Sequence, residues 1–101
     1  MFYKGLLKEI IRDSRTGTIT RQDLLDLDFE EVLENRWLWL NNPEVRTDGE
    51  IYVTFVKDEE FGEICMIDGS SKIGNFRIGN NYIGISATLS DLLNIVELLK
   101  L

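Results

Sequence analysis

The chain has 101 residues, of which 44% are hydrophobic and 29% are charged, and its net charge is −7. This length suits a single domain, residues 1–101, and the composition is that of a globular protein. Because it has no histidine and a single cysteine, Cys65, the sequence excludes an intramolecular disulfide, a structural zinc site and the histidine-dependent hydrolases.

The N-terminal part predicts a pair of helices. Apolar residues recur at helical spacing near the start, at Phe2, Leu6, Leu7, Ile10 and Ile11. After a polar turn over 13–18, Thr20 stands where a helix N-cap is expected, with Asp23 three residues later.

The second helix is expected over about residues 21–40, on the spacing of its apolar side chains. These residues are Leu25, Phe29, Val32, Leu33 and Leu40. The apolar run over 37–40 also fits a short buried strand, and Pro43 ends the element on either interpretation because the residue before proline disfavours helix.

From residue 50 the pattern changes to that of strands. Residues 50–57 consist mainly of strand-forming side chains, and further strands are expected over 63–67, 73–78 and 82–87. The segment 68–71 is a predicted turn, and 79–81 carries the glycine and asparagines of a tight hairpin. Short loops favour pairing between neighbours, so these strands predict a four-stranded antiparallel meander.

The C-terminal part predicts a helix that packs on the sheet. Leucines and Val96 recur at helical spacing over residues 89–101, and Thr88 or Ser90 is placed to cap the helix. Together the predicted elements indicate an α+β fold with an N-terminal helical pair, a four-stranded meander and a C-terminal helix.

Negative charge is concentrated in the middle of the chain. Residues 23–68 hold fourteen acidic residues against three basic ones. Two dense groups supply the candidate binding residues, which are Asp23, Asp26, Glu30, Glu31 and Glu34, followed by Asp58, Glu59, Glu60 and Glu63. Such a surface repels nucleic acid, whose affinity comes largely from lysine and arginine, and attracts a basic protein. Solubility alone is the competing explanation of the charge.

Tryptophan is the most suggestive aromatic residue for a contact with a partner. Trp37 lies next to Arg36 and close to Glu34, and tryptophan and arginine are enriched in interface hot spots. The alternative is that Trp37 belongs to the core, where a large side chain buries the most area. The sequence leaves both interpretations open.

These features predict a small acidic, non-enzymatic protein-binding domain that occupies a basic surface of a partner protein. Inhibitors, immunity proteins and nucleic-acid mimics act in this way, and a nuclease or another nucleic-acid-binding protein is the matching partner. The alternative is an assembly subunit that self-associates through its apolar C-terminal helix or an edge strand. No cofactor or metal is expected.

The location is expected to be cytoplasmic. No stretch has the ~20 apolar residues that a membrane span needs, and the first residues lack the pattern of a secretory signal. A single cysteine also suits a reducing compartment. We therefore expect no contact with a membrane.

Overall fold

The computed structural model describes residues 17–72 and 74–100. The predicted helix over 2–11 lies outside these residues. The described chain forms, in order, α2 (Arg21–Asp26), β1 (Glu30–Leu33), β2 (Arg36–Leu40), the short 3-10 helix η1 (Arg46–Asp48), β3 (Glu50–Asp58), β4 (Gly62–Ser71), β5 (Gly74–Ile78) and α3 (Leu89–Leu99).

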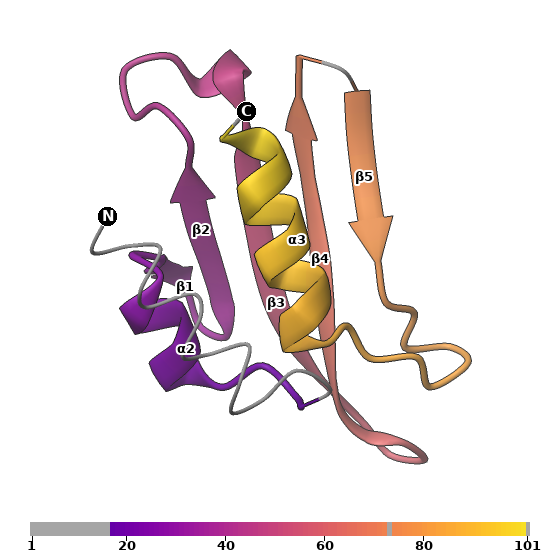
Figure 1. The fold of residues 1–101 in the computed structure, drawn as a ribbon. Helices are drawn as coiled ribbons and strands as arrows, with labels where there is room; N and C mark the ends of the chain where they lie inside the picture. Colours follow the sequence, from indigo (N-terminus) through magenta and orange to yellow (C-terminus); the bar gives the residue numbers. More distant parts are fainter. Residues whose placement is uncertain (1–16, 73, 101) are drawn as a thin grey trace.

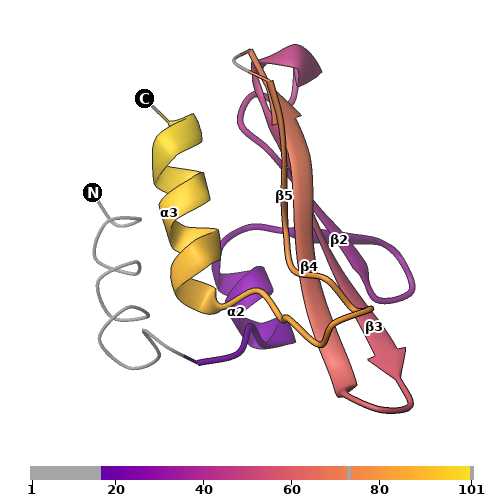
Figure 2. The same cartoon turned by 90° about the vertical axis from the view of Figure 1, so that its right-hand side faces the viewer.

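The strands form one antiparallel sheet in the order β1-β2-β3-β4-β5, so every strand pairs with its neighbour in sequence. Both described helices lie on the same face of the sheet (Figures 1 and 2). The predicted α+β class and the meander are therefore confirmed. The sheet has five strands instead of four, and the described residues place one short helix, α2, before it instead of the predicted helical pair.

The core lies between this face of the sheet and the helices. Alternate residues of the central strands point into it, as strand geometry requires, and α3 contributes its apolar stripe. The core members with no more than 1% exposure are Leu24, Leu27, Ile51, Val53, Ile67, Ala87, Leu89, Leu92, Leu93 and Val96.

The predicted helix over 21–40 is wrong beyond residue 26. Helix α2 stops because Asp28 adopts a positive φ of 67°, and the N–H of Phe29 donates to the carbonyl of Leu24 at 2.9 Å. This is a Schellman ending, in which aspartate takes the place that glycine usually occupies. The chain then reverses and forms the β1–β2 hairpin, so the strand interpretation of residues 37–40 is confirmed.

The predicted strand over 82–87 is also wrong. Residues 81–84 form a turn that is closed by an isolated bridge between Asn80 and Ile85, and Gly84 has a φ of 74°. The turn predicted over 68–71 is instead part of β4, where Gly69 leaves room for the ring of Phe76.

Helix α3 begins with a full capping box. Thr88 Oγ1 accepts a hydrogen bond from the N–H of Asp91 at 3.2 Å, and Asp91 Oδ2 accepts one from the N–H of Thr88 at 3.0 Å. Thr88 is thus the cap, and Ser90 lies inside the helix.

Loss of this cap is expected to destabilise the domain. The variant Thr88→Ala should lower the free energy of unfolding by about 1 kcal/mol, because the N–H of Asp91 loses its acceptor. Urea denaturation measures this change, with Ser90→Ala as the matched control. Equal losses for the two variants would contradict the role of the cap.

Candidate functional site

Two acidic turns lie at the same end of the sheet. Alternate turns of a meander share an end, and the β1–β2 turn (34–35) and the β3–β4 turn (59–61) do so here (Figure 1). Arg21 lies between them, since its Nη2 donates to Asn35 Oδ1 at 2.9 Å and lies 3.3 Å from Glu63 Oε2. Acids that are distant in sequence are thereby gathered in space.

Most of the predicted binding residues belong to this end of the sheet. We call them the acidic end: Glu30, Glu31, Glu34, Asp58, Glu59, Glu60 and Glu63. The basic residues of α2 and of the described strands at this end are Arg21, Arg36 and Lys57, and Arg77 of β5 stands level with Glu30 in the register of the sheet. Carboxylates outnumber cations there, so the local charge is negative.

Asp23 and Asp26 stand on α2 and not on the strands and turns of this group, and both have local roles in the helix. Asp23 forms the capping box with Thr20, accepting a hydrogen bond from its N–H at 2.9 Å. Asp26 accepts a hydrogen bond from Gln22 Nε2 at 2.9 Å. The acidic part of the helix expected over 21–40 is thus a short helix followed by an acidic edge strand.

Three carboxylates of the acidic end shape the turns themselves. Asp58 Oδ1 accepts hydrogen bonds from the N–H groups of Glu60 and Phe61 at 2.8 and 3.0 Å. Glu31 Oε2 accepts from the N–H of Asn35 at 3.2 Å, and Glu63 pairs with Arg21.

The other four carboxylates are exposed and have no partner within residues 17–72 and 74–100. They are Glu30, Glu34, Glu59 and Glu60. An exposed carboxylate of this kind retains its full charge for a contact with another molecule, so these four are the ones that a partner can use.

Trp37 lies in the core, which supports its interpretation as a core residue over that as an interface residue. Only 6% of the residue is exposed, and it stands on β2 opposite Val53 of β3. Its Nε1 finds no hydrogen-bond acceptor among the described residues. Trp37 therefore offers no surface to a partner.

An exposed apolar group lies beside the acidic end, and the sequence patterns did not identify it. Its members are Phe61, Tyr82, Ile83 and Ile85, with exposures of 43%, 87%, 61% and 53%, and we call them the apolar patch. A Cβ placed on Gly84 would lie 2.5 Å from the ring of Phe61, so the 80–85 loop touches the β3–β4 turn. The sequence does hold a signal for this patch, since large apolar residues occur there within a run of glycine and asparagine that is typical of a loop.

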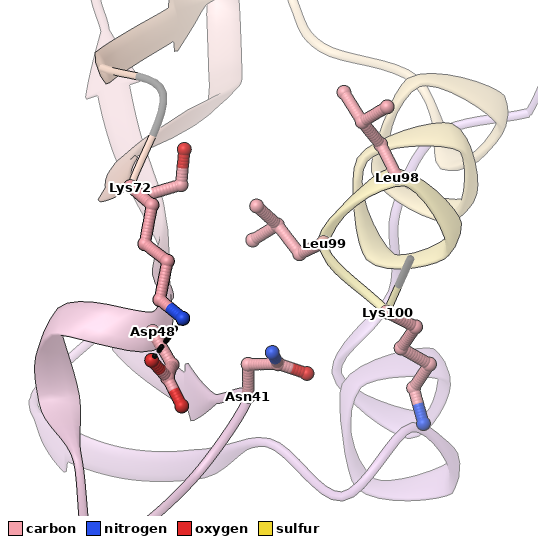
Figure 3. Close-up of a pocket in the computed structure, with 7 residues that line it drawn as sticks. Asn41, Asp48, Lys72, Leu98, Leu99 and Lys100 are labelled. Atoms are coloured by element: carbon pink, nitrogen blue, oxygen red, sulfur yellow. Dashed lines mark ion pairs between the residues drawn. The ribbon is translucent and has the colours of Figure 1, made fainter.

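The opposite end of the sheet carries paired charges. Lys72 Nζ lies 3.1 Å from Asp48 Oδ1, and this contact lowers the pKa of Asp48 (Figure 3). The pair stands at the edge of a hollow of about 310 Å³ whose other side is formed by Leu98 and Leu99 (Figure 3). Since the two charges compensate each other, this end exerts a weaker field than the acidic end.

The face of the sheet that the helices leave open carries charges of both signs around Tyr52. The guanidinium of Arg36 lies 4.1 Å from the centre of the Tyr52 ring, and Arg46 Nη2 donates to the Tyr52 hydroxyl at 3.3 Å. Arg46 also pairs with Glu50 at 3.1 Å. Arg36 and Arg46 therefore both contact other side chains of this chain.

The described residues offer little for covalent or metal chemistry. Burial raises the pKa of Cys65 to about 12, so its thiol stays protonated near neutral pH and is a poor nucleophile. No group of three potential metal ligands comes together in the described part of the chain.

Neither α2 nor α3, the helices seen in this part, has the length and apolar character of a membrane span.

Comparison with protein-family models, with curated proteins and with solved structures finds no match for this chain.

Proposed function

We propose that this chain is a small, non-enzymatic protein-binding domain whose acidic end occupies a basic surface of a partner protein. The observation that carries the proposal is the topology of the meander, which gathers seven carboxylates from two turns and the strands beside them at one end. Nuclease inhibitors and other mimics of nucleic acid provide the chemical precedent, because their targets present surfaces rich in lysine and arginine.

The distribution of charge supports this role better than net charge alone. At the far end Asp48 is paired with Lys72, and Glu50 with Arg46. The acidic end keeps four exposed carboxylates without described partners, so the negative field is polarised along the sheet. A polarised field orients an approaching cationic surface and raises the rate of association.

Charge reversal at the acidic end is expected to weaken binding of a cationic probe. The variant Glu34→Lys/Glu59→Lys should bind a fluorescent oligolysine about tenfold less tightly at low ionic strength, because two carboxylates that face the probe become cations. Its thermal midpoint should stay within a few degrees of the wild type, since exposed charges contribute little to stability. Fluorescence anisotropy measures the affinity at low and at high salt.

The matched control places the same charge change elsewhere. The variant Glu44→Lys/Glu97→Lys reverses two exposed acids, one in the β2–β3 connection and one on α3. It should bind the oligolysine nearly as tightly as the wild type. If both variants lose affinity equally, net charge alone is responsible and the acidic end has no special role.

Self-association remains the alternative proposal, with β5 as the edge strand that it would use. Helix α3 contributes most of its apolar residues to the core, and the exposed one is Leu98, at 54%. Light scattering at high salt tests this alternative, because screening removes the repulsion between acidic copies while apolar contacts persist. A dimer under these conditions would favour the alternative.

A further inference from the structure

The apolar patch is unusual because its large side chains are exposed to water on a loop that is ordered by hydrogen bonds. Tyr82 is 87% exposed and Ile83 is 61% exposed. Exposed apolar groups that are rimmed by polar residues mark sites of protein contact. Asp58, Glu59 and Glu60 immediately precede Phe61 in the same turn, and Arg77 of β5 lines a hollow together with Tyr82, so the polar residues around the patch are mainly acidic.

The patch is held in place by hydrogen bonds within its loop and between the loop and β4. Asn80 and Ile85 exchange two backbone hydrogen bonds, of 2.7 and 2.9 Å, and the N–H of Tyr82 donates to Asn80 Oδ1 at 2.9 Å. The loop is also tied to β4, because the N–H of Cys65 donates to Ser86 Oγ at 3.0 Å. A surface that is ordered before binding loses less conformational entropy when a partner arrives.

The charge beside the patch decides which kind of partner fits. A second copy would bring its own acidic turn against this one, and like charges in contact are unfavourable. Nucleic acid and an anionic lipid surface are disfavoured for the same reason. The occupant that matches both the apolar centre and the acidic rim is a protein surface with apolar side chains flanked by lysine or arginine.

We propose that the apolar patch is the anchor of the interface and inserts among the apolar side chains of such a basic partner. This inference rests on the proposed function, because the carboxylates of the acidic end supply the attraction. The acidic end and the apolar patch have different effects. The charges steer the encounter, whereas buried aromatic and aliphatic side chains slow dissociation.

Two synthetic probes separate these contributions. One is an amphipathic helical peptide of leucine and lysine, and the other is an oligolysine with the same number of lysines, each labelled with fluorescein. The wild-type protein should bind the amphipathic peptide more tightly than the oligolysine. The variant Tyr82→Ser/Ile83→Ser should lose at least about tenfold in affinity for the amphipathic peptide, with its affinity for oligolysine unchanged.

The control variant removes exposed apolar side chains away from the patch. Val45→Ser/Leu98→Ser changes residues that are 43% and 54% exposed, and it should bind both probes as the wild type does. Thermal unfolding of both variants verifies that each remains folded. A loss of equal size in the two variants, or none in the patch variant, overturns the inference.

The failures of the two proposals are distinguishable. If the wild type binds neither probe, both the proposed function and the inference are overturned. If it binds oligolysine as tightly as the amphipathic peptide, the acidic end is active but the patch is not an anchor. Binding of the patch to anionic vesicles, or dimerisation that Tyr82→Ser/Ile83→Ser abolishes, would assign it to a different occupant and overturn the inference.

Discussion

Replacing Trp37 with alanine is expected to destabilise the domain by about 3–5 kcal/mol, the usual cost of removing a large buried side chain. Trp37 is 6% exposed and lies on β2, between the edge strand β1 and the central strand β3. Since a domain of this size has a stability of about 5–15 kcal/mol, this loss is a large fraction of the total. Urea denaturation followed by circular dichroism measures the change.

A second variant tests the environment of the indole. Trp37 Nε1 has no acceptor among the described residues, so Trp37→Phe removes no hydrogen bond that the structure shows. It should cost only about 1–2 kcal/mol, mainly from the reduced volume. If Trp37→Ala instead unfolds at the same urea concentration as the wild type, the residue is not in the core and its role in an interface has to be reconsidered.

The central strands could be predicted because their side chains carry strong strand propensity. Strand β3 extends over Glu50–Asp58, close to the predicted 50–57, and its buried residues alternate with half-buried ones. Helix α3 could be predicted for a related reason, since its spacing and its Thr88 cap point to the same element. In these segments local preference and burial agree, so the pattern is sufficient.

The segment 21–40 could not be predicted correctly, because its turns use unusual residues. Asp28 and Asn35 adopt the positive φ values that glycine usually supplies, at 67° and 61°. Without a glycine or proline to interrupt it, the sequence presents a continuous helical spacing of apolar residues. Pairing of β2 with β3 then decides the structure of residues 36–40, and that contact is not local in sequence.

The candidate site could be predicted in part. Composition identified the acidic residues, but their gathering at one end depends on the hairpin of β1 and β2, and residues 30–33 of β1 were expected as helix. Residues 82–87 were expected as a strand because Tyr82, Ile83 and Ile85 are strong strand formers. Positive φ values at Gly79 and Gly84, 98° and 74°, bend the chain into a turn and leave these side chains exposed.

Gly69→Ala is expected to be the most damaging glycine substitution in the sheet. A Cβ at this position would clash with the backbone oxygen of Glu50 and would lie 2.6 Å from Cζ of Phe76. The ring can rotate, but the oxygen of Glu50 belongs to β3, which pairs with β4 along this stretch. Relief of the clash therefore requires the two strands to separate locally, at an expected cost of about 3 kcal/mol or more.

Gly74→Ala is the matched control for this prediction, because nothing lies within 4 Å of a Cβ at Gly74 and only its φ of 132° is strained. We expect a cost of about 1–2 kcal/mol for this variant, measured by urea denaturation beside Gly69→Ala. Adding Phe76→Leu to Gly69→Ala should recover little stability, since the backbone contact with Glu50 remains. Full recovery would instead show that the aromatic ring alone excludes a side chain from position 69.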